Sequence, residues 1–196
     1  MKILFISDVE AKLYWDYYKK EYFEDIDLII SCGDLKSSYL SFLATMTSIP
    51  LLYVHGNHDE GYATKPPEGC ICIEDCVYEY EGIRILGLGG SYKYKMGKWQ
   101  FDEDEMAKRV KKLKRKLKKS KGIDILVTHA PAFGFHDSED LCHRGFEVFN
   151  ELIETLNPKI FAHGHVHLNY GRQFPREDMI GETKVINAFE KYIIEI

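Results

Sequence analysis

Short apolar runs, many of them rich in β-branched residues, recur along the whole chain. Runs of this length and composition are typical of buried β-strands. We expect strands at residues 3–6, 26–30, 51–54, 83–88, 123–127, 160–162, 184–187 and 192–196. Helical candidates lie between them at residues 12–20, 37–46, 102–119 and 145–156, with Ser37 a plausible cap of the second.

This alternation of strands and helices predicts an α/β fold with a partly parallel sheet. Residues 70–88 lack a helical pattern and read as shorter antiparallel strands, and the same holds after residue 180. Two packed mixed β-sheets flanked by helices accommodate both halves of the chain. Without an internal repeat or a long linker, residues 1–196 are expected to form a single domain.

Composition excludes several other classes of protein. Hydrophobic residues make up 45% and charged residues 29% of the 196 residues, which argues against a disordered or collagen-like chain. No apolar run approaches the ~20 residues of a membrane span. The first ten residues already include acids and read as a strand rather than a signal peptide. Five cysteines, an odd number, indicate reduced thiols and a cytoplasmic protein.

The charge is unevenly distributed. Residues 108–121 hold ten of the 26 basic residues and no acid, while the net charge is −5. Met106, Val110, Leu113 and Leu117 in this region share one helix face, so we expect the lysines to be solvated. A nucleic-acid-binding helix is the alternative, but the acidic remainder of the chain does not favour it.

Polar side chains follow five of the expected strands. The segments are Ser7-Asp8-Val9-Glu10, Cys32-Gly33-Asp34, Gly56-Asn57-His58-Asp59, Thr128-His129 and Gly164-His165-Val166-His167. Because the carboxyl ends of parallel strands face one crevice, these side chains are expected to converge. Their oxygen and imidazole donors suit divalent first-row metals, and their number suits two metals sharing a carboxylate.

The five segments resemble the calcineurin-like metallophosphoesterases. The pattern of that family is D-x-H, G-D, G-N-H-D/E, a lone His, and G-H-x-H, and the corresponding blocks occur here in this order between residues 8 and 167. The resemblance implies a four-layer α/β/β/α sandwich. It also implies one metal held by Asp8, Asp34 and His167, and a second held by Asp34, Asn57, His129 and His165.

The resemblance further implies a catalytic arrangement. His58 matches the histidine that contacts the phosphate and protonates the leaving oxygen, and Asp59 is expected to orient its imidazole. The expected nucleophile is a metal-bridging hydroxide, because bound metals lower the pKa of water.

Glu10 stands where the family usually has histidine in the first block. As a metal ligand it would add negative charge and favour Mn²⁺ or Mg²⁺ over Zn²⁺. The alternative is that Glu10 hydrogen-bonds to water beside a weaker first site. We interpret Glu10 as a ligand and two divalent ions, Mn²⁺ favoured, as the cofactors. Mg²⁺, Fe, Zn²⁺ and Ni²⁺ are the alternatives.

Other histidines lie close to these blocks. His55 and His163 are interpreted as structural residues behind the site. The loop of residues 131–145 follows His129 and offers His143 as a candidate substrate-binding residue, with a polar helix cap as the alternative. The basic and aromatic segment 91–99 is interpreted as a solvated edge that could also rim the site.

The leading hypothesis is a metal-dependent phosphodiesterase acting on small phosphodiesters or nucleotides. The chain is near the minimum length for the family it resembles and has no inserted cap domain, and an open site of this kind can admit a diester with two substituents. A nuclease using the 108–121 helix is the first alternative and predicts salt-dependent nucleic-acid binding. A non-enzymatic scaffold of the same fold is the second, and the presence of His58, His165 and His167 argues against it. No membrane partner is expected.

Overall fold

The computed structural model describes residues 1–117, 122–170 and 175–196, and it shows two β-sheets packed face to face. The first sheet has the order β13-β1-β2-β3-β4. Its strands are β1 (Lys2–Ile6), β2 (Leu28–Ser31), β3 (Leu51–Tyr53), β4 (Ile71–Cys72) and β13 (Tyr192–Glu195). β1 to β4 run parallel, and β13 joins β1 antiparallel.

The second sheet has the order β11-β12-β10-β9-β6-β5. Its strands are β5 (Cys76–Tyr80), β6 (Ile83–Leu88), β9 (Ile125–Thr128), β10 (Ile160–His163), β11 (Glu177–Ile180) and β12 (Thr183–Asn187). The four central strands are parallel, and β5 and β11 add antiparallel edges. A small pair, β7 (Ser91–Tyr92) and β8 (Gln100–Phe101), lies outside both sheets.

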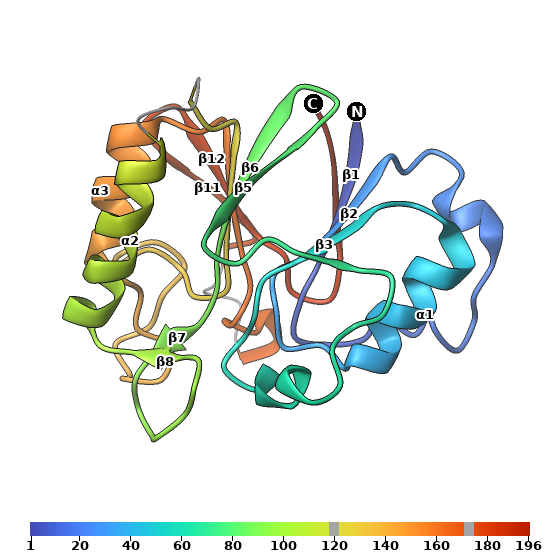
Figure 1. The fold of residues 1–196 in the computed structure, drawn as a ribbon, viewed down its shortest axis with the longest axis horizontal. Coiled ribbons are helices and arrows are strands. Elements are labelled where there is room, and N and C mark those ends of the chain that lie inside the picture. Colours follow the sequence, from blue (N-terminus) through green and yellow to red (C-terminus); the bar gives the residue numbers. More distant parts are fainter. Residues whose placement is uncertain (118–121, 171–174) are drawn as a thin grey trace.

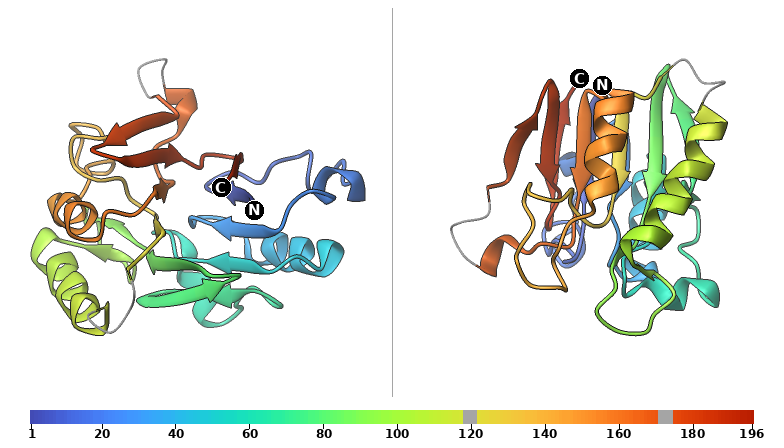
Figure 2. Two further views of the ribbon diagram at one scale, coloured as in Figure 1. Left: turned by 90° about the horizontal axis from the view of Figure 1, so that it is seen from above. Right: turned by 90° about the vertical axis from the view of Figure 1, so that its left-hand side faces the viewer.

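Helices cover the outer faces of the two sheets (Figures 1 and 2). α1 (Ser37–Thr47) packs on the first sheet, and α2 (Glu103–Leu117) and α3 (Glu147–Leu156) pack on the second. Three short 3₁₀ helices complete the described elements: η1 (Lys20–Phe23), η2 (Asp59–Ala63) and η3 (Leu168–Tyr170). The expected fold of two mixed sheets flanked by helices is therefore confirmed.

Three hydrophobic layers hold the sandwich together, and β1 shows how one strand serves two of them. Ile3 and Phe5 face the second sheet, whereas Leu4 and Ile6 pack toward α1. All four are fully buried, because side chains alternate between the two faces of a strand and both faces are covered. This explains why the strands read as continuous apolar runs in the sequence.

The apolar face expected on α2 is present. Met106, Val110, Leu113 and Leu117 are all buried against the second sheet and α3. Lys108, Lys111 and Lys112 are exposed, as the amphipathic interpretation predicts. Residues 118–121, the end of the basic run, lie outside the described residues.

Several local predictions are wrong. Residues 12–20 form turns followed by η1 rather than a helix, because their aromatic side chains pack individually: Tyr14 is buried, and the Trp15 ring lies 5.0 Å from that of Phe42. β4 pairs parallel with β3, although β5 and β6 form the expected hairpin.

The helix caps also differ from the expectation. Lys36, not Ser37, occupies the N-cap position of α1, and no side chain caps that helix. α3 begins at Glu147 rather than at residue 145. Its first amides are capped from another helix, because the Glu103 carboxylate accepts the N–H groups of Glu147 and Val148 at 3.2 and 2.8 Å.

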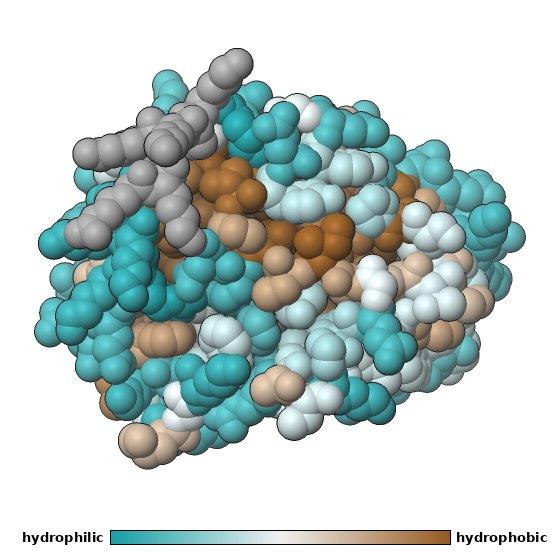
Figure 3. Space-filling view, in the orientation of Figure 1, coloured by the Kyte–Doolittle hydropathy of each residue, from teal (hydrophilic) through white to brown (hydrophobic). Residues whose placement is uncertain are grey.

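On the face drawn in Figure 3, apolar side chains gather in a band among polar ones, over the region where Figure 1 places β5 and β6. Within the part of the chain that the structure describes, no helix is both long and apolar enough to cross a membrane.

Candidate metal centre

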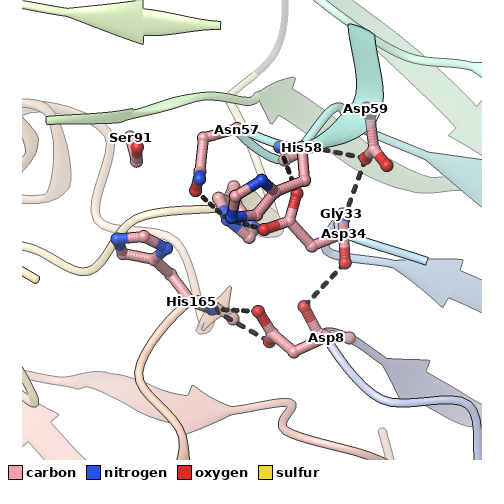
Figure 4. A network of polar contacts seen from close by, with 12 residues as sticks. Asp8, Gly33, Asp34, Asn57, His58, Asp59, Ser91 and His165 are labelled. Carbon is pink, nitrogen blue, oxygen red and sulfur yellow. Dashed lines mark hydrogen bonds and ion pairs between the residues drawn. The ribbon is translucent and has the colours of Figure 1, made fainter. Parts of the chain in front are cut away.

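The polar side chains that follow five parallel strands meet at one end of the sandwich. Asp8, Asp34 and Asn57 come from the first sheet, and His129, His165 and His167 come from the second. In Figure 4, Asp8, Asp34, Asn57 and His165 point toward a common centre. The expected convergence is therefore present, and the site lies across both sheets.

Three of these residues have a left-handed backbone. The φ angles are 66° at Asp8, 56° at Asp34 and 67° at His165. Such conformations cost roughly 1–3 kcal/mol each in a non-glycine residue and persist where surrounding contacts enforce them. Here the Asp8 carboxylate accepts the His165 backbone N–H at 2.9 and 3.1 Å, and Asp34 Oδ1 accepts the His58 N–H at 2.7 Å. The carboxylates thus lock the sharp turns that carry the site.

Two glycines let these turns approach one another closely. A Cβ on Gly56 would lie 2.0 Å from Asp34 Oδ1, and a Cβ on Gly164 would lie 1.9 Å from Ser7 Oγ and 2.8 Å from Asp8 Oδ2. Any side chain at either position would displace a carboxylate of the site.

His129 lies at the centre of the buried part of the site. Its Nε2 is 3.2 Å from Asp34 Oδ2 and 3.0 Å from Asn57 Oδ1. Its Nδ1 is 2.8 Å from the Cys32 carbonyl oxygen, to which it donates. That bond directs Nε2 toward the carboxylate and amide oxygens, as a metal-ligating histidine requires.

His165 and His167 complete the group from the end of β10. His165 Nε2 donates to the Cys142 carbonyl oxygen at 2.7 Å, which leaves Nδ1 as the basic nitrogen. The His165 ring centroid is 4.8 Å from that of His129. His167 Nε2 lies 3.7 Å from Asp8 Oδ1. Asp8 and His167 therefore form a second pair beside Asp34 and His129.

The electrostatics of the site favour a cation. Burial raises the pKa of Asp34, but the charge and hydrogen bond of His129 outweigh it and lower that pKa to about 2. Burial lowers the pKa of His129, but Asp34 and Asp8 outweigh it and raise that pKa to about 9. Burial, followed by the charge of His129, lowers the pKa of His165 to about 4. The carboxylates thus hold positive charge between them, while His165 remains neutral.

This donor set fits divalent metals. The ligand atoms of Asp34, His129 and His165 all lie within 4.8 Å of one another. Carboxylate, amide oxygen and neutral imidazole are donors for Mn²⁺, Fe, Ni²⁺ and Zn²⁺, and both central histidines have their second nitrogen fixed by a backbone carbonyl.

His58 is exposed at the mouth of the site, and its main chain is held by Asp34. That Asp59 orients the His58 imidazole stays a prediction, and the contacts of Asp59 Oδ2 are to the main chain. Asp59 Oδ2 accepts the backbone N–H groups of Asp34 and Gly56 at 2.8 and 2.7 Å. Burial, and then the charge of Asp34, raises the pKa of Asp59 to about 6. Asp59 therefore shapes the loops that carry the ligands.

Glu10 lies in the same cavity as Asp8 and His58, but its carboxylate is paired elsewhere. Its Oε1 is 3.4 Å from Lys36 Nζ, and it is not part of the group formed by Asp34, His129 and His165. The structure therefore gives Glu10 a lysine partner that the sequence analysis did not consider.

His143 is in the site region, as expected. Its ring lies 5.3 Å from that of His165, and its Nδ1 lies 2.9 Å from Asp140 Oδ1. It lines a cavity together with Asp8, Asn57, His58 and His167. The alternative role as a helix cap is wrong, because α3 begins three residues after Arg144 and is capped by Glu103.

Tyr94 is a site residue that the sequence analysis did not single out. Its hydroxyl accepts a hydrogen bond from Asn57 Nδ2 at 3.3 Å, which turns Asn57 Oδ1 toward His129. The Gln100 side chain accepts the N–H groups of Tyr94 and Lys95 and so fixes this loop. The mixture of lysine and tyrosine in segment 91–99 was the available signal, and the rim interpretation is the better one.

Two buried networks support the site from behind. Glu74 accepts from the backbone N–H and Nδ1 of His55 at 3.1 and 3.0 Å and pairs with Arg109. His163 Nε2 and His136 Nδ1 lie 2.9 Å apart. His55 and His163 are thus structural, as expected, whereas Glu74 and Arg109 left no signal in the sequence.

Two cavities flank the candidate ligands. The larger has a volume of about 650 Å³ and the smaller about 270 Å³. Asp8, Asp34 and His58 line both, so the cavities meet at the site.

A family model described as "Calcineurin-like phosphoesterase" matches residues 1–169. The chain belongs to this family. Hydrolysis of phosphoesters with bound divalent metals is the general activity that membership implies, and the ligand group described above agrees with it.

Curated relatives extend this result. UPF0046 protein T07D4.2 of Caenorhabditis elegans is 28% identical over 138 residues, which are 69% of this chain and 32% of the relative. UPF0046 protein C25E10.12 of the same organism is 26% identical over an alignment of 225 residues, covering 96% of this chain and 74% of the relative. The aligned part thus spans about a third of the first relative and three quarters of the second.

Solved structures share the fold. TT1561 of Thermus thermophilus superposes with a TM-score of 0.62 at 18% identity, covering 96% of this chain and 89% of that one. A putative 5'-nucleotidase from Staphylococcus aureus, in complex with alpha-ketoglutarate, gives a TM-score of 0.58 at 14% identity, covering 100% and 51%.

Proposed function

We propose that this chain is a phosphodiesterase that uses two divalent cations, with Mn²⁺ preferred, and acts on small phosphodiesters or nucleotides. The observation that carries the proposal is the convergence of carboxylate, amide and imidazole donors from both sheets beside the exposed His58.

The ligands fall into two sets that share Asp34. Asp34, Asn57, His129 and His165 would hold one cation, and Asp8, Asp34 and His167 the other. Bound cations would neutralise phosphate oxygens and activate water. Mn²⁺ suits this mixture of oxygen and imidazole donors.

The residues of the chain itself supply positioning and proton transfer. His58 projects at the junction of the two cavities, where its imidazole can donate a proton to the oxygen of the departing alcohol. Asp34 holds the His58 main chain, and Asp59 holds the Asp34 and Gly56 amides, so the ligand loops are fixed before substrate binds.

The two cavities favour a diester over a monoester. A phosphodiester carries two substituents on phosphorus, and two cavities meet at the shared residues Asp8, Asp34 and His58. No residue of the described part of α2 lines either cavity, so the basic helix supplies no support for a nucleic-acid track.

The test compares hydrolysis of bis-p-nitrophenyl phosphate and p-nitrophenyl phosphate by metal-stripped protein supplied with Mn²⁺, Mg²⁺, Zn²⁺ or Ni²⁺. We expect faster diester hydrolysis, highest with Mn²⁺, and a fall of about 10²–10⁴-fold in His58→Ala. Glu10→His tests whether Glu10 is a metal ligand. A changed metal preference supports that role, whereas an unchanged preference indicates that Glu10 serves as the ion-pair partner of Lys36. Lys111→Ala on the exposed face of α2 is the control. Absence of hydrolysis with every metal in a folded protein would overturn the proposal.

A further inference from the structure

The larger cavity at the site has two chemically different ends. At the inner end it shares Asp8, Asp34 and His58 with the smaller cavity. The remainder of its wall includes the carboxylates of Glu10 and Asp59. It also includes two lysines and three hydroxyl side chains from around the start of α1 and just after η2: Lys36, Ser37, Ser38, Thr64 and Lys65. These lysines and hydroxyls provide hydrogen-bond donors and positive charge. Of the two carboxylates, Glu10 pairs with Lys36, and Asp59 accepts the backbone N–H groups of Asp34 and Gly56.

The two lysines reach the cavity from different segments. Lys65 follows η2 and is exposed, and Lys36 precedes α1 with 78% of its side chain exposed. Lys36 is 3.4 Å from Glu10, which lines the same cavity. A solvent-exposed pair of this kind is weak, so Glu10 keeps the ammonium near the cavity while its remaining N–H donors stay available to an anion.

The groups that line the two ends of the cavity limit the class of ligand that it can bind. The inner end is proposed to bind the phosphoryl group that reacts, so a group reaching the outer end belongs to the same substrate. Lysine ammonium groups with nearby hydroxyls suit a phosphate, which accepts from several donors at once. The volume of about 650 Å³ lies within the ~300–1,000 Å³ range of pockets that enclose small molecules.

We propose that the outer end of the larger cavity binds a second phosphate on the substrate, through Lys36 and Lys65. The preferred substrates are then phosphodiesters of nucleotides that carry another phosphate. This inference rests on the proposed phosphodiesterase function and adds a substrate class to it.

The experiment uses two esters that differ only in that second phosphate. They are thymidine 5′-(p-nitrophenyl phosphate) and the same ester with a 3′-phosphate, each tested with saturating Mn²⁺. We expect kcat/KM to be about fivefold or more higher for the 3′-phosphorylated ester, an effect on the scale of one or two exposed ion pairs. Each variant is judged by the ratio of its two kcat/KM values, which cancels differences in metal loading.

Lys65→Gln and Lys36→Gln are expected to bring this ratio toward one, and Lys111→Gln on α2 to leave it as in the wild type. Equal rates for both esters in the wild type would overturn the inference and leave the phosphodiesterase proposal standing. A preference that survives in both Lys36→Gln and Lys65→Gln would overturn it as well, because the second phosphate then binds elsewhere. Failure to hydrolyse either ester or bis-p-nitrophenyl phosphate with any metal identifies instead a failure of the proposed function.

Discussion

Glu74 is the most instructive residue to perturb, because one buried carboxylate joins three segments behind the site. It accepts from the His55 backbone N–H at 3.1 Å, from His55 Nδ1 at 3.0 Å, and from the Gly89 N–H at 2.6 Å. Arg109 Nη2 of α2 donates to Glu74 Oε1 at 2.5 Å. Only 10% of the Glu74 side chain is exposed, and 13% of Arg109.

Glu74→Gln keeps the shape but removes the charge and presents an amide to groups that are themselves donors. Breaking one partner of a buried pair costs ~3–5 kcal/mol. Arg109 retains Asp75 at 3.0 Å and the Gly89 carbonyl at 2.8 Å, so we expect a smaller loss of about 2–3 kcal/mol. For a chain of this size that corresponds to a fall of about 4–12 °C in Tm.

Urea unfolding and thermal unfolding of Glu74→Gln measure the loss, with Glu79→Gln on the exposed face of β5 as the matched control. The control should stay within ~0.5 kcal/mol of the wild type. A loss below about 1 kcal/mol in Glu74→Gln would refute the reasoning, because the charge would then contribute little to holding the loops.

The stability difference between the wild type and Glu74→Gln should depend on pH. Burial raises the pKa of Glu74, but the hydrogen bond of His55 and the charge of Arg109 outweigh it, so the pKa is lowered from 4.5. A depressed pKa means that the stabilisation is present above the unfolded value and is lost as the pH falls through the folded value. The difference between wild type and Glu74→Gln should therefore be constant near neutrality and shrink below about pH 4.5. A difference that grows in acid would contradict the assignment.

Three further variants test the site and the core. Gly164→Ala should weaken metal binding, measured by isothermal titration, because its Cβ would lie 2.8 Å from Asp8 Oδ2; tight binding would contradict the close approach. Tyr94→Phe should weaken it by roughly tenfold, because the Asn57 amide loses the acceptor that orients it, whereas unchanged affinity would show that the orientation has another cause. Leu113→Ala should cost about 2–5 kcal/mol in urea unfolding, and a loss near zero would contradict its burial between α2 and the second sheet.

The order of strands and the ligand blocks could be predicted because both are local in sequence. Strands that are buried on both faces appear in the sequence as continuous apolar runs. The turns that follow them contain polar residues next to glycine. Topology then brings Asp8 and His165 together across 157 positions without any further information. Parallel strands bring the ligands of each sheet to one edge, and the packing of the two sheets joins the two sets.

The remaining features depend on side-chain packing, which spacing along the chain does not record. Residues 12–20 have helical spacing, yet they form turns in which the Tyr14 ring packs against Phe23 and the Trp15 ring against Phe42. Asp59 stands beside His58 in sequence, but its carboxylate turns to backbone amides. Tyr94 and Glu74 act through partners 37 and 19 residues away, a separation over which sequence periodicity carries no signal.

Because the site lies across both sheets, the concentration of free metal should affect the stability of the fold. A cation held by Asp34 from one sheet and His129 from the other must be released before the sheets can separate. By thermodynamic linkage, free metal at a hundred times its dissociation constant adds about 2.7 kcal/mol to the free energy of unfolding. Chelation should therefore lower Tm in the wild type and equally in His58→Ala, because this effect depends on the ligands and not on His58.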